Sequence, residues 1–592
     1  MKTAFIFILF VGLVIRLILV GNPGFEADIS FWKSWSLAAI DHGVVWTAFN
    51  TNINYPPGFI YVLWLMGKLY SLIANPHDYF SFWRVNNFSF LLTSKSIAIV
   101  ADLAIAVLLY SFLKQKNKLI SLGADNHFLN RNLPLVASAI FFLNPTVLLD
   151  SAVWGQVESL GLLFTLAAII LLFYRRPLLA TAIFAIGPLV KLQNIIFIPI
   201  FFIFVLRFFD LKTVFKSLGI FTAVFLAIIL PFIIQGKTDQ ILFLMTVNSD
   251  YFPWMSLNAH NLWWIVSKAA GMTTIDKMTV LGIMNAKKVG LYLFSSSYLL
   301  ACLLTFLKPT ARNFLLSLTF AIFSFFLLST QSHERYSYPV VVLLLFLYPF
   351  LEQKFKKFFW LIYALFSVNV FFNIHAGLVV NYPFSGLSFL TAVTNNFTTL
   401  LNSWLSLLLY VMMLPFIASQ ISLFYLFSAA AFFVALIVFN HAGYLFKGKI
   451  SLTSFKPIII SQGYGSLEIN RSVNSSSGWK KWNRLSTDYF YYRKGFGTHA
   501  NSNLVFDLNR KFRSFSTDFG IDTEAPTQAS VVFQIHGDGN LLFESQKMGR
   551  FDFPQHTKVN VTGIKFLGLT VTDAGDGING DHADWFNPVL YK

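Results

Sequence analysis

Long apolar runs fill the first 450 residues of this chain, and they constrain its fold more than any other feature. Runs of about 15 to 25 apolar residues alternate there with short polar loops, a pattern typical of consecutive membrane-spanning helices. The whole chain of 592 residues is 56% hydrophobic and only 12% charged. We therefore predict a polytopic α-helical membrane protein, large enough to enclose a cavity between its helices.

A second composition begins near residue 450. Residues 1–449 contain 14 acids and the much shorter remainder contains 13, together with more Gly, Ser and Asn. Apolar runs at 529–535 and 541–545 flank His536–Asn540, a turn typical of a β-hairpin. Several short strands with such turns predict a soluble β-sandwich. The only cysteine, Cys302, lies outside this region, so the domain is expected to be stable without a disulfide.

The basic residues give the expected topology. They gather in short clusters between apolar runs, as in cytoplasmic loops, so the net charge of +17 does not indicate nucleic acid as a partner. The clusters are Lys114–Lys118, Arg175–Arg176, Lys212 with Lys216, Lys308 with Arg312, and Lys354–Lys357. With these inside and residues 1–20 kept as the first span, about thirteen spans result. The N-terminus is then cytoplasmic and the C-terminal domain extracytoplasmic.

Two segments, 58–75 and 88–113, compete for one crossing between the first outer loop and Lys114. The second is longer and ends in the basic cluster, so we predict that it spans the membrane. The first follows Tyr55-Pro56-Pro57 and is expected to lie along the membrane surface. Counting both as spans gives about fourteen crossings and a cytoplasmic C-terminal domain, an alternative that stays open.

Two carboxylates stand beside aromatic residues directly after the first apolar segment. Glu26 and Asp28 precede Phe31 and Trp35 in a loop expected on the outer face. A carboxylate in that place could deprotonate an acceptor hydroxyl, which is the task of the general base in glycosyl transfer. The plain alternative is that Asp28 only caps the helix that follows it.

Another outer loop, between Asn144 and Glu158, combines an aromatic ring, an amide and an acid in Trp154, Gln156 and Glu158. Aromatic faces stack on sugars while amides and acids take their hydroxyls. An interfacial anchor would equally explain Trp154. Loop 251–264, which contains Asn261 and Trp263, suits a carbohydrate for the same reason, or an interfacial helix.

Cations are scarce on the outer side, and two of them stand out. Arg335 lies beside His333 and Glu334 at the outer end of an apolar run, and Lys191 occupies a comparable place. A guanidinium at a membrane boundary suits a phosphate, although a structural salt bridge would leave the same pattern.

Lys95 and Asp102 lie inside one apolar run, and an intramembrane charge is by default a functional hypothesis. The membrane part contains no cluster with metal-ligand spacing, no phosphate-cradling glycine loop and no Walker pattern. Nucleotide chemistry is therefore not expected.

Together, and in this order, the motifs resemble the GT-C superfamily of polyprenyl-phosphate-sugar glycosyltransferases, especially bacterial relatives of the GPI mannosyltransferase II family. A further likeness is to the dolichyl-phosphate-glucose glucosyltransferases. The matching segments are Asp28–Trp35, Tyr55–Gly58, Asn144–Pro145, Trp154–Gln156, Lys191 with Gln193, Asn258–Trp263 and His333–Tyr336. The resemblance covers nearly all of residues 1–445 and implies that Asp28 is the catalytic base, with Glu26 beside it. Many relatives carry Asp where this chain has Glu158.

The C-terminal region resembles the NPCBM family, a galactose-binding-like β-sandwich classed as a carbohydrate-binding module. The match runs from Lys494–Ala500 through Asp538–Gly539 to Asp581–Trp585 and covers about residues 456–592. The resemblance implies sugar binding near His499, Asp584 and Trp585, and it admits a structural Ca²⁺.

The sequence therefore predicts two domains, a GT-C type domain over residues 1–449 with its first outer loop at 22–87, and an NPCBM-like domain over 456–592. The leading hypothesis is an inverting glycosyltransferase of the plasma membrane. It would move a hexose, with mannose favoured, from a polyprenyl-phosphate carrier to an extracytoplasmic glycan, lipid-linked or protein acceptor. Membrane lipid is the surrounding partner.

In this hypothesis Asp28 is the base, and Arg335, helped by Lys191 or His333, stabilises the leaving phosphate. The sugar would lie near Trp154, Gln156 and Glu158. A divalent cation, Mg²⁺ or Mn²⁺, is left open. The competing classes are a transporter or flippase of lipid-linked sugars and a non-catalytic glycan-binding membrane protein.

Overall fold

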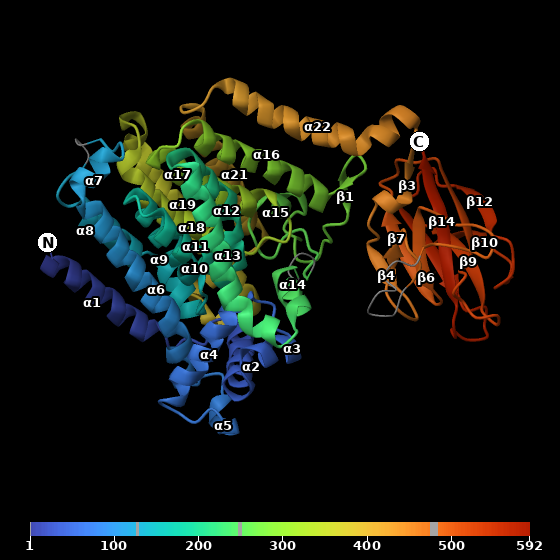
Figure 1. The fold of residues 1–592 in the computed structure, drawn as a ribbon, viewed down its shortest axis with the longest axis horizontal. Helices are drawn as coiled ribbons and strands as arrows, with labels where there is room; N and C mark the ends of the chain where they lie inside the picture. The colour runs from blue at the N-terminus through green and yellow to red at the C-terminus, as the bar shows by residue number, and fades with distance from the viewer. Residues whose placement is uncertain (1, 126–128, 247–250, 474–483) are drawn as a thin grey trace. The chain divides into compact units, whose positions relative to one another are not determined.

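The computed structural model describes residues 2–125, 129–246, 251–473 and 484–592. These residues divide into two compact units. The first unit comprises Met1–Thr273 and Leu293–Ala430, and the second comprises Thr274–Tyr292 and Ala431–Lys592. The first is mostly helical and the second is mostly β-sheet (Figure 1).

The helical unit begins with α1 (Lys2–Leu19), α2 (Glu26–His42), α3 (Val44–Asn50), α4 (Pro57–Ser71), α5 (Tyr79–Phe82), α6 (Phe88–Lys114) and α7 (Lys116–Ser121). It continues with α8 (Leu133–Phe142), α9 (Pro145–Leu148), the π-helix η2 (Leu149–Trp154), α10 (Glu158–Phe173), α11 (Pro177–Val190), the 3₁₀-helix η3 (Leu192–Ile196), α12 (Phe197–Phe208), α13 (Leu211–Ile234) and α14 (Thr238–Thr246). The last group is α15 (Leu262–Val266), α17 (Ala311–Leu328), α18 (Tyr338–Leu347), α19 (Gln353–Asn381), α20 (Ser388–Val393) and α21 (Asn396–Ala418). Two further helices, α16 (Ala286–Leu307) and α22 (Leu423–Lys447), each cross the boundary between the units.

Eight helices in the described residues are long and apolar enough to cross a membrane: α1, α6, α13, α16, α17, α19, α21 and α22. The pair formed by α8 and Pro145–Trp154, bent by 42°, would add a ninth. Four more apolar helices are shorter. As predicted, residues 88–114 form one of the long helices, whereas α4 has only 15 residues and is not among them. The count of thirteen spans stays a prediction.

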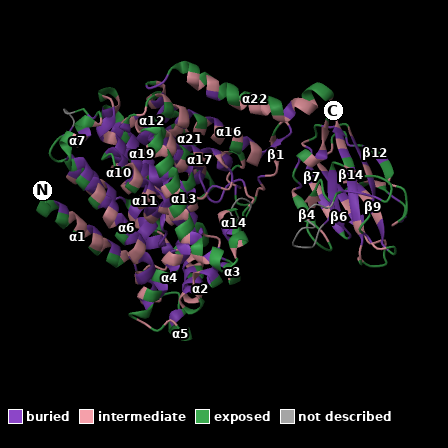
Figure 2. Ribbon diagram, viewed as in Figure 1, coloured by how far each residue is buried: buried purple, intermediate pink, exposed green. Residues whose placement is uncertain are grey.

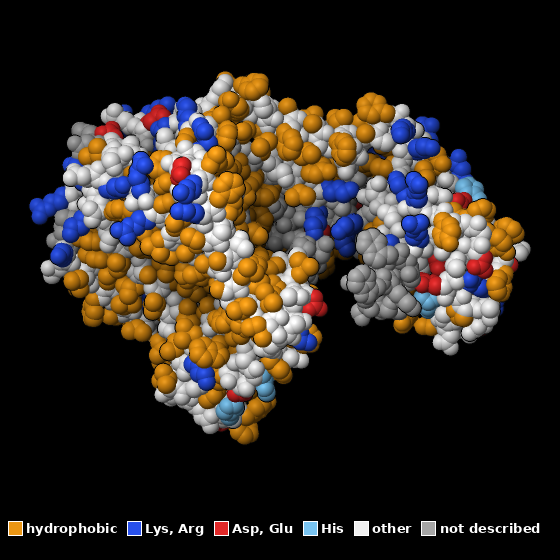
Figure 3. Space-filling view, viewed as in Figure 1, with side chains coloured by type: hydrophobic (Ala, Val, Ile, Leu, Met, Phe, Trp, Pro, Cys, Tyr) orange, Lys and Arg blue, Asp and Glu red, His pale blue; other side chains and the backbone are white. Residues whose placement is uncertain are grey.

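The burial pattern of the helical unit separates a core from an apolar outside. Helices α17 and α18 are almost wholly buried (Figure 2). In contrast, α1 turns large apolar side chains outward, with Ile6, Phe7 and Phe10 all more than 60% exposed. Hydrophobic side chains cover much of the visible surface, and Lys and Arg gather toward the end where α7 lies (Figure 3). Such an outside fits a lipid environment better than water.

The two charges inside α6 are held by the fold. Asp102 accepts hydrogen bonds from Arg16 Nη2 of α1 at 2.9 Å and from the hydroxyl of Ser159 of α10. The Arg16 and Asp102 side chains are both fully buried. The ammonium of Lys95 donates to three backbone carbonyls, those of residues 20, 22 and 153. These groups therefore join helices to one another, and the geometry gives them a structural role.

The described residues of the second unit form fourteen short strands. They are β1 (Thr279–Leu281), β2 (Met284–Asn285), β3 (Lys449–Ser451), β4 (Ile459–Ser461), β5 (Glu468–Ile469), β6 (Gly495–His499), β7 (Ser502–Asp507), β8 (Ser514–Ile521), β9 (Ser530–Gly537), β10 (Asn540–Glu544), β11 (Met548–Gly549), β12 (Gln555–Asn560), β13 (Phe566–Thr572) and β14 (His582–Tyr591). One sheet has the order β10-β9-β13-β7-β4 with β11 beside β9, and the other has β12-β8-β14-β6-β5 with β3 beside β14. Alternate side chains of the strands fill the core between them. The predicted β-sandwich is confirmed, including the β9–β10 hairpin, where Gly537 pairs with Asn540.

A short hairpin from the middle of the chain belongs to this second unit. Strands β1 and β2 pair within residues 274–292, and Ile283 between them is buried in the core of the sandwich. Thr279 N donates to Asp507 Oδ2 at 2.8 Å, and Ile283 N donates to His441 Nε2 at 3.1 Å. The sequence alone predicts these residues in the membrane part, because strands of two and three residues give no readable period.

Candidate active site

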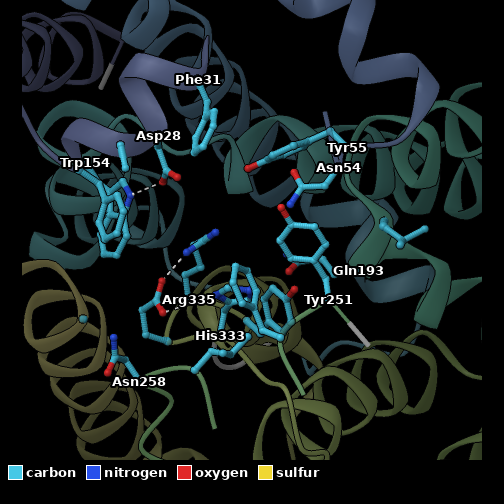
Figure 4. Close-up of a pocket in the computed structure, with 18 of the residues that line it drawn as sticks. Asp28, Phe31, Asn54, Tyr55, Trp154, Gln193, Tyr251, Asn258, His333 and Arg335 are labelled. Atoms are coloured by element: carbon cyan, nitrogen blue, oxygen red, sulfur yellow. Dashed lines mark hydrogen bonds and ion pairs between the residues drawn. The ribbon is translucent and has the colours of Figure 1, made fainter. Parts of the chain in front are cut away.

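The helical unit encloses a cavity of about 430 Å³ (Figure 4). Its wall comes from α2, from the loops around residues 52–56, 191–193, 251–258 and 331–336, and from the end of α19. The cavity brings together five of the predicted residues: Asp28, Trp154, Lys191, His333 and Arg335, which are separated by up to about 300 residues in the sequence.

Asp28 lies in the first turn of α2, where the helix N-terminus favours a negative charge. Its Oδ2 accepts hydrogen bonds from Trp154 Nε1 at 3.0 Å and from Gln156 Nε2 at 2.5 Å. The cap residue of α2 is Phe25, so Asp28 does not cap the helix, and the loop expected around it is helical from Glu26 onward. The carboxylate is therefore fixed in orientation at the cavity wall.

The turn before α2 explains how Asp28 reaches these donors. Gly24 has a φ of +66°, and a Cβ at this position would come within 2.4 Å of the Val153 carbonyl oxygen. Only glycine allows the chain to pass so close to η2 in this conformation. The π-helical turn of η2 in turn presents Trp154, a local distortion that is frequent at functional sites.

Two side chains lie against the Trp154 ring. Phe25 stacks on one side at a centroid distance of 5.1 Å, and the Arg335 guanidinium lies 5.5 Å from the ring centroid. Gln156 is fully buried with its amide on Asp28. The sequence predicts that Trp154 and Gln156 bind a sugar. In the structure, both side chains instead donate hydrogen bonds to the Asp28 carboxylate and hold it in place.

Two cations that line the cavity share one carboxylate, that of Glu158. Glu158 Oε1 lies 2.6 Å from Lys191 Nζ and 3.3 Å from Arg335 Nε. Gln193 Nε2 donates to the other oxygen, Oε2. Glu158 is buried and is not among the residues that line the cavity. It therefore holds the two cations at a fixed spacing instead of facing a ligand itself.

The Lys191 position depends on close packing between α10 and the segment after α11. A Cβ on Gly161 of α10 would lie 2.8 Å from the Lys191 Cβ and 2.4 Å from the Asn194 amide. Arg335 is held differently, by a turn in which Tyr336 N donates to the His333 carbonyl at 3.2 Å. Its Nη1 is paired with Glu334.

The charge states of these groups follow from burial and from their neighbours. Burial would raise the pKa of the Glu334 carboxyl, but the Arg335 guanidinium holds that pKa at about 2. Burial would lower the pKa of Lys191, and the nearby Glu158 carboxylate more than offsets this and raises it. Burial lowers the pKa of His333, so its imidazole is neutral at pH 7. At pH 7 the cavity wall thus carries two cations, Lys191 and Arg335, and a neutral His333.

Several residues that line the cavity had no assigned role in the sequence analysis. Figure 4 shows Asn54, Tyr55, Tyr251 and Asn258 pointing toward the same space as Arg335. The Lys191 ammonium lies 5.5 Å from the Tyr55 ring centroid. The Tyr55-Pro56-Pro57 motif was the available signal for Tyr55, because prolines fix the chain direction there. Asn258 begins the matched segment Asn258–Trp263, whereas Asn54 had no signal of its own.

Besides Gln156 and Glu158, three more predicted residues do not line the cavity: Glu26, Asn261 and Trp263. Glu26 is the first residue of α2, and the described residues of the cavity wall do not include it. Asn261 caps α15, and its amide donates to the Phe326 carbonyl at 3.1 Å. The indole of Trp263 donates to the Leu328 carbonyl at 2.8 Å. Asn261 and Trp263 therefore fasten the 251–264 loop to α17, so the expected sugar contacts are structural contacts.

The described residues contain no group of three or more His, Cys, Asp or Glu side chains that could hold a metal ion. The carboxylates at the cavity are engaged by protein donors, Asp28 by Trp154 and Gln156, and Glu334 by Arg335. This donor set does not fit the divalent cation left open by the sequence, and the structural Ca²⁺ admitted for the sandwich stays a prediction.

The predicted sugar-binding residues of the sandwich are buried. Trp585 is 0% exposed and packs against Phe533 at a centroid distance of 5.0 Å, inside the core. Asp584 is also fully buried, and burial together with the neighbouring Asp522 raises its pKa well above the ordinary value. His499 is 2% exposed. Trp585 fills the core because β14 alternates, so Ala583 and Trp585 face inward.

Comparison with protein families identifies the C-terminal region. The model of the NPCBM/NEW2 domain matches residues 448–591, so this part of the chain carries a domain of that type. A protein of Renibacterium salmoninarum named "Putative endo-alpha-N-acetylgalactosaminidase" is 28% identical over 127 residues. That alignment covers 22% of this chain and only 8% of the relative's length.

Solved structures give matches of two kinds. The CBM51 module of Clostridium perfringens GH95, in complex with methyl-galactose, is 30% identical over 24% of this chain and 99% of that one, with a TM-score of 0.22. The arabinosyltransferase EmbB of Mycobacterium smegmatis aligns with 100% of this chain and 64% of its own, at 10% identity and a TM-score of 0.24. A TM-score this low does not establish a shared fold for the helical unit.

Proposed function

We propose that the cavity catalyses inverting glycosyl transfer from a polyprenyl-phosphate sugar. The observation that carries this proposal is the arrangement of one oriented carboxylate, Asp28, in the same cavity as two cations, Arg335 and Lys191. A general base and an anion-stabilising site in one enclosed space are the two groups that this reaction needs.

The reaction can be written with these residues alone. The acceptor hydroxyl oxygen attacks the anomeric carbon, and its proton passes to the Asp28 carboxylate. The bond between the anomeric carbon and the phosphate oxygen breaks, and polyprenyl phosphate leaves with the electron pair. Attack from the face opposite the leaving group inverts the anomeric configuration. The hydrogen bonds from Trp154 and Gln156 keep the Asp28 carboxylate oriented toward the acceptor hydroxyl during the transfer.

Arg335 and Lys191 stabilise the departing phosphate. A guanidinium carries five N–H donors and an ammonium three, so both can bind phosphate while they keep their contact with Glu158. Glu158 sets the distance between the two cations. His333, neutral at pH 7, can donate one more hydrogen bond to the same group. No step needs a metal ion.

The aromatic residues of the cavity suit the rest of the donor. Phe31, Tyr251 and Phe252 line it and are each more than 40% exposed. Such side chains can contact the face of a hexose or the first isoprene units of the carrier. The carrier, a membrane lipid, would enter from the bilayer around the apolar helices. We favour mannose as the hexose because the motifs resemble a mannosyltransferase family.

In this proposal the helical unit carries out the transfer and the C-terminal domain binds the acceptor glycan. We propose that the helical unit spans the plasma membrane with its N-terminus in the cytoplasm, and that the NPCBM/NEW2 domain lies outside and binds the acceptor glycan. Binding by a tethered domain raises the local concentration of acceptor at the catalytic unit. A lipid-linked sugar, a polysaccharide or a glycoprotein are acceptors that this arrangement accommodates.

The proposal is tested by a transfer assay on the purified full-length protein in nanodiscs. Polyprenyl-phosphate mannose, glucose and galactose are offered with cell-envelope glycans, and the product anomer is determined by NMR. We expect one donor to be consumed with inversion, Asp28→Asn to be inactive, and Glu26→Gln to remain active as the matched control. Movement of lipid-linked sugar across proteoliposomes without any transfer would instead identify a flippase, and neither activity would leave a glycan-binding protein.

A further inference from the structure

A group of exposed aromatic side chains lies on the second unit, outside both the cavity and the residues predicted for sugar binding. The turn at 486–491 carries Tyr489, Phe490 and Tyr491, which are 42%, 52% and 81% exposed. The neighbouring loop at 549–554 carries Phe551 and Phe553, which are 61% and 63% exposed. We call these five residues the aromatic platform. Exposed clusters of this kind usually mark a binding surface.

Contacts between the two loops hold the rings of the aromatic platform in place. The rings of Tyr489 and Phe553 stack at a centroid distance of 3.9 Å, and the Tyr489 hydroxyl donates to the Phe551 carbonyl at 2.8 Å. Beneath them, Arg550 is paired with Asp488, so the two loops are also joined by an ion pair. The rings are thus held in place before any ligand arrives, which reduces the entropy that binding must lose.

The platform lies at the end of the sandwich away from the place where the chain enters it. The chain enters at β3, where Lys449 pairs with Tyr591, which in turn pairs with Ser514 at the start of β8. The 549–554 loop leads into Gln555, which pairs with Phe519, five residues further along β8. That separation is roughly 16 Å.

The chemistry of the platform fits a glycan. Flat aromatic rings can stack on the C–H faces of successive sugars, and Asp488, Arg550 and Asp552 around them can bond to hydroxyls.

We propose that the aromatic platform binds a carbohydrate chain and gives the C-terminal domain an extended glycan-binding surface. This inference rests on the proposed glycan-binding role of that domain, but it does not depend on the transfer reaction. It predicts that affinity rises with the length of the oligosaccharide, because longer chains cover more rings.

The test uses the full-length Asp28→Asn protein in nanodiscs, so that catalysis does not consume the probe. Binding of mannose-, galactose- and GlcNAc-based oligosaccharides of one to six units is measured for this protein with and without Tyr491→Ala, Phe551→Ala and Phe553→Ala together. Ile460→Ala on β4, an apolar residue that is 48% exposed, is the matched control. We expect the triple variant to lose about tenfold in affinity for chains of four or more units, and the control to lose none.

Three results would overturn the proposal. The first is equal binding of long chains by the triple variant and its parent. The second is absence of oligosaccharide binding combined with capture of phosphatidylglycerol vesicles, or self-association, that the triple variant abolishes. The third is absence of binding by the parent to every chain, which would also remove the glycan role of the domain. Transfer by the wild-type protein, measured separately, would still decide the function of the cavity.

Discussion

The helical unit holds two buried groups of charges, and they differ in what they face. In the first, Arg16 and Asp102 are fully buried and bond only to protein groups. In the second, Arg335 and Lys191 bond to Glu158 on one side and line a cavity on the other. Both pairs must overcome the cost of removing charge from water. The difference shows that burial alone does not separate the two groups, whereas lining a cavity does, and only the second group has that feature.

The first group should matter for folding and hardly for the reaction. In Asp102→Leu, the Arg16 guanidinium keeps its contacts to two backbone carbonyls but loses its counter-ion. We expect a loss of about 3 to 5 kcal/mol in the free energy of unfolding, because an unpaired buried charge remains. Thermal unfolding in nanodiscs measures it.

The double variant Arg16→Met with Asp102→Leu is the control, and it should recover most of that stability because no charge remains unpaired. Transfer per folded molecule should stay unchanged in both. Normal stability of the single variant with a selective loss of transfer would reverse the comparison.

Glu334 at the cavity offers a test through pH. Its pKa is about 2 in the folded protein, below the ordinary 4.5, so its contribution to stability is complete above pH 4.5 and disappears as the pH falls toward 2. A difference of this size corresponds to about 3 kcal/mol. The melting temperatures of wild type and Glu334→Gln should differ near neutral pH and converge below pH 4.5. Parallel curves over the whole range would contradict the Arg335–Glu334 pairing.

The cavity cations should matter for the donor. Arg335→Lys keeps the charge but loses the planar fork that can hold two phosphate oxygens. We expect kcat/KM for the donor to fall about 10- to 100-fold with an intact fold. Arg207→Lys, whose guanidinium donates to the Phe306 carbonyl, is the matched change away from the cavity and should have no effect on transfer. Equal behaviour of the two variants would remove the phosphate role from Arg335.

Two tryptophans give the finest comparison. Trp154→Phe removes the indole hydrogen bond to Asp28, and Trp263→Phe removes a similar one to the Leu328 carbonyl. Each bond contributes about 1 kcal/mol. For Trp154 we expect a roughly fivefold slower transfer, because the carboxylate is less well oriented, and for Trp263 a small loss of stability only. A slower rate in both would mean that Trp263 also acts in the cavity.

Much of the fold could be predicted from the sequence because its signals are long or local. Apolar runs predicted the helices, and the turn at His536–Asn540 predicted its hairpin. Asp28, Lys191, His333 and Arg335 come from separate motifs and line one cavity. Polar and charged residues that are scarce on an apolar background are easy to recognise in a sequence.

Other features depend on packing that a single sequence does not reveal. The role of Trp154 follows from Gly24, which brings α2 against η2. The inward face of Trp585 follows from the register of β14. The hairpin at residues 274–292 joins a core whose other strands are far along the chain. An aromatic residue near an acid in the sequence can bind a sugar or can hold the carboxylate in place. Only its neighbours in the folded protein distinguish the two roles.

The central claim is that Asp28 acts as the base while Arg335 and Lys191 hold the donor phosphate. The most direct measurement is the single-turnover transfer rate of Asp28→Asn together with its Kd for the donor, on one preparation in nanodiscs. We expect the rate to fall by about 10² to 10⁴ and the Kd to change less than threefold, because the asparagine keeps the shape but cannot take the proton. An undiminished rate, or a rate that is restored by more donor, would contradict this account.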